Sequence, residues 1–294
     1  VPLTIPDPVT LVMGLILISA AIATVVTHRI RILSIIMLGT VGLMVSLAFS
    51  RFSAPDLALT QISVELVTII LMMMALHMLP RSTPKESSSC RKWRDIVLSV
   101  LAGGGAAAVM MAVLTRPFDT ISDFFLAHSV PGGGGSNVVN VILVDFRGFD
   151  TLGEITVLVI AGLVIYALLH NFDITGPRTD AQGYPWSRDR FPIILVNITR
   201  PLLPLALLFS VYIFLRGHNN PGGGFIAGLI TVAVLILQYI ASGIVWTRPR
   251  FHFDNHVIMA LGLIVALVTG FGSWVVGYPF LTSTFAYVTL PLVG

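Results

Sequence analysis

Charged residues are scarce in this sequence. Of its 294 residues only 11% are Asp, Glu, Lys or Arg, whereas 55% are hydrophobic and the mean hydropathy is +0.92. A typical soluble domain has roughly 25% charged residues, so this chain lacks the side chains needed to cover a water-facing surface. The composition argues against a soluble enzyme, a nucleic-acid-binding protein and a disordered protein. It indicates an integral membrane protein that contacts lipid rather than nucleic acid.

Cysteine is also nearly absent, because Cys90 is the only one. A single cysteine excludes a disulfide framework and an all-cysteine metal site. No group of His, Cys and Asp has metal-ligand spacing, and no Ser/His/Asp set supports covalent catalysis. We therefore expect neither a metal site, nor a cofactor, nor an enzymatic activity. The sequence starts at Val1 rather than Met and stops at Gly294 directly after an apolar stretch, which suggests a piece of a larger polypeptide.

Long apolar runs dominate the sequence. A helix that crosses a hydrocarbon core of ~30 Å needs about 20 apolar residues. Residues 280–294 form an apolar piece that is too short and too rich in Thr and Pro to be a span. The sequence predicts an all-α, polytopic membrane protein with about eight transmembrane helices, near residues 8–27, 32–50, 56–79, 95–115, 152–171, 193–215, 223–246 and 256–277.

The positions of the basic residues support this helix count. Connections after the first, third, fifth and seventh runs contain 12 of the 17 Lys and Arg residues, whereas those on the opposite side contain four and Arg200 lies inside the sixth run. Such an alternating bias places the richer side in the cytoplasm. The cytoplasmic set is Arg29, Arg31, Arg81, Lys85, Arg91, Lys92, Arg94, Arg178, Arg188, Arg190, Arg248 and Arg250.

Polar segments divide the chain. Residues 80–94 and 172–192 are cytoplasmic linkers, and the long outer connection 116–151 contains an amphipathic stretch followed by PGGGGS, which we expect to be a flexible break. The resulting units are a three-helix module (1–80), a two-helix module with the long outer loop (81–172), a cytoplasmic linker (173–192) and a third membrane module (193–294).

One acidic residue lies deep inside an apolar run. Glu65 is about ten residues into the third run, or roughly 15 Å from its start, which puts it near the middle of the membrane. A charged side chain there costs around 3 kcal/mol and is a functional hypothesis by default. Gln61 and Thr68 share parts of its helical face and could relay protons. The alternative is a permanently protonated carboxyl, or one paired with a neighbouring helix for assembly.

A second acidic group begins the fifth run, in DFRGFDTLGE at 145–154. Asp150 and Glu154 are four residues apart and share a helical face. Carboxylates so close repel each other, which favours a proton or a cation between them. The alternative is ordinary helix N-terminal chemistry, in which acids complement the helix dipole. We expect Asp145 and Arg147 to form a surface pair.

Three consecutive glycines join the sixth and seventh runs, in RGHNNPGGGFIAG at 216–228. Because glycine weakens a helix, this stretch suits a backbone that approaches another surface closely or exposes N–H groups. Gly224 and Gly228 equally fit the small-xxx-small pattern of helix packing. The candidate residues are Pro221, Gly222, Gly223, Gly224 and Phe225.

Three histidines could pass protons. His77 and His170 lie near predicted cytoplasmic helix ends, and His218 lies in the glycine-rich connection. Each could exchange a proton near neutral pH. The alternative for each is a histidine that is simply exposed to solvent or to the membrane interface.

Three stretches resemble one protein family. APDLALTQISVELVTIILMMMALHMLP (54–80) and VNVILVDFRGFDTLGEITVLVIAGLVIYALL (139–169) resemble the C-terminal part of the A subunit of Mrp-type multisubunit cation/proton antiporters. HNNPGGGFIAGLI (218–230) is similar to the B subunit of the same family. The order resembles the fused AB subunit of some bacteria, which is related to the membrane arms of complex I and of membrane-bound hydrogenases.

This resemblance implies exchange of Na+ for protons across the bacterial cell membrane, by a complex with other Mrp subunits. Glu65, Asp150 and Glu154 match the family's functional acids, and Pro221 and Phe225 match its B-subunit glycine motif. The large helical module that normally precedes the A-tail is absent, so we do not expect this chain alone to transport. Two alternatives are a proton-conducting subunit of a redox-driven complex, and a structural scaffold with the acids in static pairs.

Overall fold

The computed structural model describes residues 7–78, 88–170, 193–251 and 254–286. Within these ranges the secondary structure is helical, without strands. The described part contains eight helices that are long and apolar enough to span a membrane, which confirms the expected all-α class. They are α1 (Pro8–Val26), α2 (Arg31–Arg51), α3 (Pro55–Met78), α4 (Ser89–Leu114), α7 (Gly148–His170), α8 (Ile193–Arg216), α9 (Gly224–Thr247) and α10 (Asn255–Val275).

Short turns fold the first three helices back on one another. Ile30 N–H donates to the Thr27 carbonyl at 2.7 Å between α1 and α2, and Ala54 N–H donates to the Phe49 carbonyl at 2.9 Å between α2 and α3. Pro55 then begins α3, at a position where the missing N–H of proline would have no intrahelical partner.

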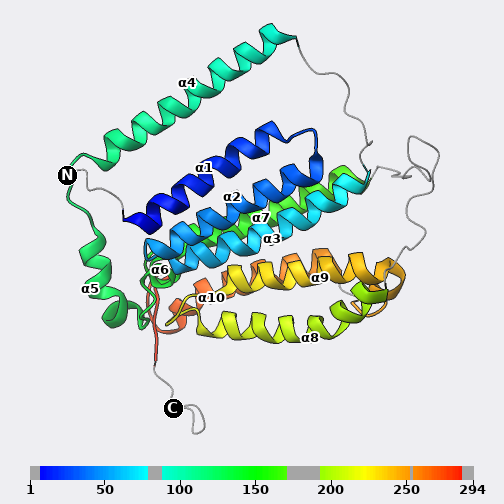
Figure 1. Cartoon of the computed structure of the whole chain (residues 1–294). Coiled ribbons are helices and arrows are strands. Elements are labelled where there is room, and N and C mark those ends of the chain that lie inside the picture. The colour runs from blue at the N-terminus through cyan, green and yellow to red at the C-terminus, as the bar shows by residue number, and fades with distance from the viewer. Residues whose placement is uncertain (1–6, 79–87, 171–192, 252–253, 287–294) are drawn as a thin grey trace.

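Five of the long helices pack in the order α1, α2, α3, α9, α8 (Figure 1). A buried serine lies between the helices of two of these pairs. Ser46 Oγ on α2 donates to the Ala58 carbonyl on α3 at 2.9 Å, and Ser210 Oγ on α8 donates to the Ala227 carbonyl on α9 at 2.7 Å. Such interhelical bonds and small residues hold helices together in lipid, where apolar burial supplies little. Helix α3 contacts both α2 and α9 and so connects the N-terminal helices to the α8–α9 pair.

The remaining long helices pack differently. Helix α7 contacts α10, where a Cβ on Gly162 would lie 2.6 Å from the Met259 sulfur. Helix α4 lies apart from the bundle in Figure 1, and none of its side chains is buried. Its apolar surface is therefore free to face lipid or another subunit.

The outer connection is ordered and helical. It contains α5 (Ser122–Gly133), α6 (Val138–Val141) and the π-helical turn η1 (Ile142–Phe146), which leads into α7. The expectation of a flexible break at PGGGGS is wrong. Its first three residues belong to the end of α5, Gly134 caps that helix with φ 71°, and Gly133, Gly134 and Gly135 are all buried.

Candidate functional site

The Glu65 carboxyl lies between α3 and α2. Glu65 is ten residues after Pro55 in the 24-residue helix α3, or about 15 Å along its axis. Its side chain is half-buried, and its carboxyl group rests on Gly42 of α2, which is buried. A Cβ on residue 42 would occupy the position of this carboxyl. The glycine therefore makes the space in which the acid lies.

The residues expected to relay protons to Glu65 make no hydrogen bond with it. Gln61 is half-buried one turn earlier and Thr68 is exposed one turn later. Among the described residues, no hydrogen bond or ion pair involves the Glu65 carboxyl. His77 lies in the last turn of α3, but its side chain is outside the described part of the chain. The acid thus lies beside a helix backbone rather than against a fixed positive charge.

Asp150 and Glu154 lie on an exposed face of α7. Arg147 forms an ion pair with Asp150, so the expected Asp145–Arg147 pair is wrong. Glu154, one turn further on, is exposed and makes no hydrogen bond or ion pair with any described residue. The structure records no such link from Glu65 to either acid in the described ranges. Among the described residues, no direct bond therefore connects Glu65 with Asp150 or Glu154.

Asp145 faces inward instead. Ser283, in the segment after α10, donates a hydrogen bond to Asp145 Oδ1, while Oδ2 is buried and has no hydrogen-bond partner in the described residues. Thr151 Oγ donates to the Leu143 carbonyl at 2.7 Å and so satisfies a backbone group of η1. The π-helical turn thereby places Asp145 and Asp150 on different sides of the chain.

The glycine-rich connection approaches α3 closely. Gly222 N–H donates to Asp56 Oδ1, in the first turn of α3, at 2.8 Å. A Cβ on Gly222 would lie 2.5 Å from the Ile213 carbonyl, and Gly223 has φ 114°, which side-chain-bearing residues rarely adopt. Close backbone approach, one of the two interpretations of this motif, is thus what the structure shows at Gly222 and Gly223.

The other end of the motif is open. Nothing lies within 4 Å of a Cβ placed on Gly228, and both Gly224 and Phe225 are exposed. A Cβ on Gly224 would lie 3.7 Å from the Phe214 ring on α8, so only the Gly224 end of the small-xxx-small pair faces another helix in the described residues. Pro221 is half-buried beside the Gly222 turn.

Hydrogen bonds of His218 connect the long outer connection (116–151) to the glycine-rich loop. Its Nε2 is 2.8 Å from the Gly133 carbonyl, and its own carbonyl accepts from Asn137 N–H at 3.1 Å. Asn137 Nδ2 also donates to the Gly217 carbonyl at 3.0 Å. A Cβ on Gly135 would lie 2.5 Å from the His218 carbonyl. The buried glycines of PGGGGS therefore permit this contact, and His218 is half-buried rather than solvated.

His170 lies in a row of rings at the opposite end of the molecule. Its ring is 5.3 Å from that of Tyr166, which in turn is 4.2 Å from the ring of His256 on α10. His256 was not singled out in the sequence, because its neighbour in space is 90 residues away in the chain.

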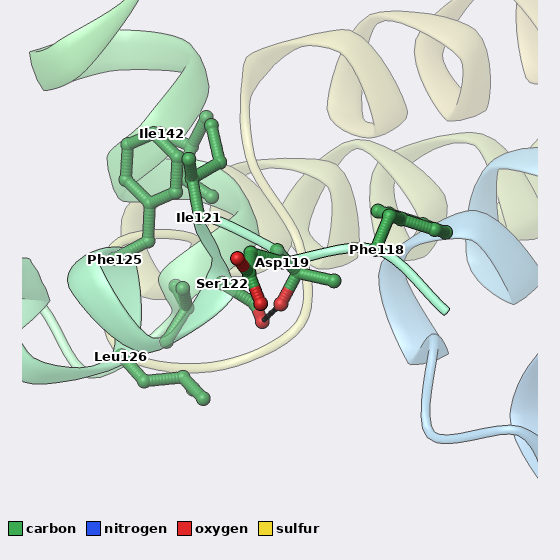
Figure 2. A pocket seen from close by; sticks show the side chains of 9 residues that line it. Phe118, Asp119, Ile121, Ser122, Phe125, Leu126 and Ile142 are labelled. Carbon is green, nitrogen blue, oxygen red and sulfur yellow. Dashed lines mark hydrogen bonds between the residues drawn. The ribbon is translucent and has the colours of Figure 1, made fainter. Parts of the chain in front are cut away.

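A surface hollow of about 540 Å3 lies at the start of α5 (Figure 2). Figure 2 shows Phe125 and Leu126 on one side and Phe118 on the other. The hydroxyl groups of Thr120 and Ser122, which also line the hollow, are hydrogen-bonded at 2.5 Å. Asp119 is the acid that lines it. None of the candidate ion-pathway residues lines this hollow, so it is separate from both acidic sites.

Two residues next to the candidate site were missed in the sequence. Gly42 was not distinguished from other glycines in apolar runs, and Asp56 looks like an ordinary acid in the first turn of a helix. A one-dimensional pattern contains no signal that Gly42 faces Glu65. For Asp56, its position directly before the Glu65 helix was the available hint.

Three family models together match most of the chain. Residues 15–81 match a model for the D subunit of MBH, and residues 90–185 match one for the E subunit of MBH. Residues 194–294 match a domain related to the MnhB subunit of Na+/H+ antiporter.

The structure agrees with these matches. It superimposes on a chain of the structure of the Mrp complex from Dietzia sp. DQ12-45-1b with a TM-score of 0.82 and 32% identity, over 98% of this chain and 32% of the other. The B subunit of the Na+/H+ antiporter of Alkalihalophilus pseudofirmus is 43% identical over 102 residues, which are 35% of this chain and 71% of that protein. The chain belongs to the Mrp antiporter family. It joins the C-terminal part of an A-type subunit to a B-type one, as expected.

A fused relative has the same order. The A/B subunit of the probable K+/H+ antiporter of Rhizobium meliloti (strain 1021) is 41% identical in an alignment 292 residues long that covers 90% of this chain. The match spans 29% of the length of that Mrp-family relative. The chain therefore corresponds to less than a third of the fused protein.

Proposed function

We propose that this chain is part of a membrane subunit of a monovalent cation/proton antiporter. Na+ is the transported cation, and H+ is the ion exchanged for it. The other partners are further Mrp subunits in the bacterial inner membrane, a proposal supported by the superposition on one chain of an Mrp complex. The chain acts as a transporter component, without a bound cofactor. Its division into units 1–80, 81–172, 173–192 and 193–294 is part of the proposal.

Glu65 is the central residue of the proposed pathway. Its depth in α3 and the absence of any recorded partner among the described residues support a carboxyl that changes its charge state during transport. A carboxyl held in a salt bridge would keep its charge, whereas one that lies on a glycine backbone can exchange a proton for a cation. Because α3 contacts both α2 and α9, a change at Glu65 would act directly between the A-like and B-like modules.

Asp150 and Glu154 form a second proposed site for a cation or a proton. The exposed face of α7 that contains them is available to a neighbouring subunit or to water. Two acids one helical turn apart attract a cation, and the Arg147 ion pair partly neutralises Asp150. The histidines His77, His170 and His218, with Gln61 and Thr68, remain proposed proton-relay positions. The glycine motif from Pro221 to Phe225 is proposed to hold the B-like module against α3.

The test is Glu65→Gln in the whole complex, reconstituted into vesicles with an internal pH dye. The amide keeps the shape of the side chain but cannot take up a proton. We expect Na+-dependent proton movement to be abolished while all subunits still co-purify. Asp123→Asn, an exposed acid on α5, is the matched control and should exchange normally. Normal exchange by the Glu65 variant would remove the central claim.

A second candidate is a proton-conducting subunit of a redox-driven complex. The matches to the MBH models over 15–81 and 90–185 favour it. The chains that co-purify with this one discriminate the two functions. A hydrogenase or quinone-reducing arm would support the second candidate, and two large helical subunits with intramembrane lysines would support the antiporter.

A further inference from the structure

Two arginines make cation–π contacts with one tryptophan at the end of α9. The guanidinium carbon of Arg250 is 4.0 Å from the ring centroid of Trp246, and that of Arg200, on α8, is 4.8 Å from it. Arg250 Nη1 also donates to the Trp246 carbonyl at 3.0 Å. Cation–π contacts of this kind orient a guanidinium group without consuming its N–H donors. Both guanidinium groups are thereby held against the same indole ring.

A break in α9 produces this arrangement. Gly243 has φ 74° and ψ 169° inside the helix, so the following turn, with Trp246, changes direction. Buried polar contacts stabilise the break. Gln238 is fully buried and its Nε2 donates to Ser242 Oγ at 2.7 Å, while Thr247, also fully buried, has its hydroxyl 3.5 Å from the Gln238 carbonyl. The cluster of basic residues thus adjoins a kink in α9 whose buried side chains are hydrogen-bonded to one another.

The cluster has an unbalanced positive charge. Arg248 lies between Trp246 and Arg250 in the chain, is exposed, and lines, with Ile244, Val245 and Pro249, a hollow of about 340 Å3. The ion pairs between described residues involve Arg51, Arg94 and Arg147, and none reaches this cluster. Two guanidinium groups on one ring, with Arg248 beside them in the chain and no ion pair to a carboxylate among the described residues, favour an anion with several oxygens, such as a phosphate.

Apolar surface adjoins the cluster. Ile244 is 60% exposed and Val245 is 86% exposed in the turn that contains Trp246. Arginine and tryptophan are favoured where a helix leaves the hydrocarbon, and the Lys and Arg bias places this end of α9 on the cytoplasmic side, where anionic lipids attract basic residues. A soluble phosphate would use the guanidinium groups but not this apolar surface.

We propose that Arg200, Trp246, Arg248 and Arg250 bind the phosphate headgroup of an anionic phospholipid of the cytoplasmic leaflet. The guanidinium groups of Arg200 and Arg250 contact the phosphate oxygens, Arg248 closes the site from the hollow, and the acyl chains lie along Ile244 and Val245. The lipid links α8 to the broken end of α9. This site is independent of the proposed ion pathway.

The experiment measures retained phosphatidylglycerol in the whole complex by native mass spectrometry. The complex is taken from nanodiscs that contain phosphatidylcholine and a graded fraction of phosphatidylglycerol. With about 1 kcal/mol per basic residue near a membrane surface, Arg248→Gln should weaken phosphatidylglycerol binding roughly fivefold, and Arg200→Gln with Arg250→Gln about thirtyfold. Arg94→Gln is the matched control, because Arg94 is on the same predicted side but pairs with Asp95 at 2.7 Å. It should retain the lipid as the wild type does.

One further arm identifies the source of the phosphate. Millimolar inorganic phosphate should not displace phosphatidylglycerol, because it lacks acyl chains. Arg248→Gln changes an exposed side chain and so keeps the test valid if the double variant fails to assemble. Unchanged retention in Arg248→Gln, an equal loss in Arg94→Gln, displacement by phosphate alone, or a carboxylate of another protein cross-linked to Arg200 would each overturn the lipid site.

Discussion

The Glu65 carboxyl on α3 lies directly on the backbone of Gly42 on α2. This relationship explains how an acid can stand ten residues inside an apolar helix without a recorded partner among the described side chains. Any side chain at position 42 larger than hydrogen would compete with the carboxyl for the same space. The pair therefore links a packing feature of α2 to the proposed transport step on α3.

Gly42→Ala should impair exchange more than stability. The added methyl group would displace the Glu65 carboxyl, and that flexible side chain can move without disturbing the backbone. We expect proton movement in vesicles to fall several-fold while the complex assembles. Gly14→Ala on α1 is the matched control, because nothing lies within 4 Å of its Cβ. Equal exchange rates for the two variants would show that the carboxyl position is unimportant.

Asp56→Ala should loosen the contact between the A-like and B-like modules. The change removes the acceptor of Gly222 N–H, and a hydrogen bond to a charged group contributes about 1.5–3 kcal/mol. We expect a lower thermal unfolding midpoint and faster proteolysis near the glycine-rich connection. Asp56→Asn keeps an oxygen acceptor and should lose less stability. Asp123→Ala, at an exposed site, controls for the loss of one acid. Wild-type proteolysis of Asp56→Ala would contradict the contact.

Gly223→Ala should destabilise the protein. With φ 114° and Asn140 Nδ2 only 3.0 Å from a Cβ placed on this residue, alanine would be strained there, at a cost of about 1–3 kcal/mol. Gly228→Ala provides the opposite expectation, because it adds a methyl group in open space inside α9, where alanine favours the helix by about 0.5–1 kcal/mol. Thermal unfolding of the two variants in the same detergent measures the difference. The same midpoint for both would refute the assigned backbone conformation.

The first turn of α1 should respond to acid. Thr10 Oγ1 donates to Asp7 Oδ1 at 2.5 Å, and Arg51 Nη2 is 3.3 Å from Asp7 Oδ2. The Thr10 hydrogen bond, followed by the Arg51 contacts, lowers the pKa of Asp7 below its ordinary value of 3.8. Because the folded pKa is depressed, the stabilisation is present above pH 3.8 and is lost as the pH falls through the folded pKa.

Thermal unfolding of wild type and Asp7→Asn across this range tests the prediction. We expect a small difference at neutral pH, since the pair is at the surface, and no difference in strong acid. A difference that persists after full protonation would mean that Asp7 acts by packing rather than by charge.

Much of the fold follows from local composition. Eight apolar runs predicted eight long helices, and all eight are present. The largest differences in starting position are at α4 and α7, which begin at Ser89 and Gly148, because polar residues extend a helix beyond its apolar part. Hydropathy detects the membrane-crossing portion of a helix and not its polar ends.

The outer connection shows where local patterns mislead. PGGGGS has the composition of a flexible linker, yet three of its four glycines are buried, and the His218 loop packs against one of them, Gly135, and bonds to another, Gly133. His218 itself looked like a solvated loop residue. The contact joins residues separated by 85 positions in the chain, so neither side of it contains a local signal. Arg147 likewise pairs with Asp150 instead of Asp145 because the π-helical turn rotates Asp145 towards Ser283.

By itself, the sequence determined the membrane class, the helix count and the depth of Glu65, since each depends on how many apolar residues lie in succession. Tertiary structure alone decided that Gly42 lies under Glu65, that Asp56 accepts from Gly222 across 166 residues, and that Arg200 and Arg250 meet on Trp246. Lipid solvates every apolar helix face about equally well. The choice of neighbours therefore depends on backbone fit and a few polar contacts, which appear only when the helices are assembled.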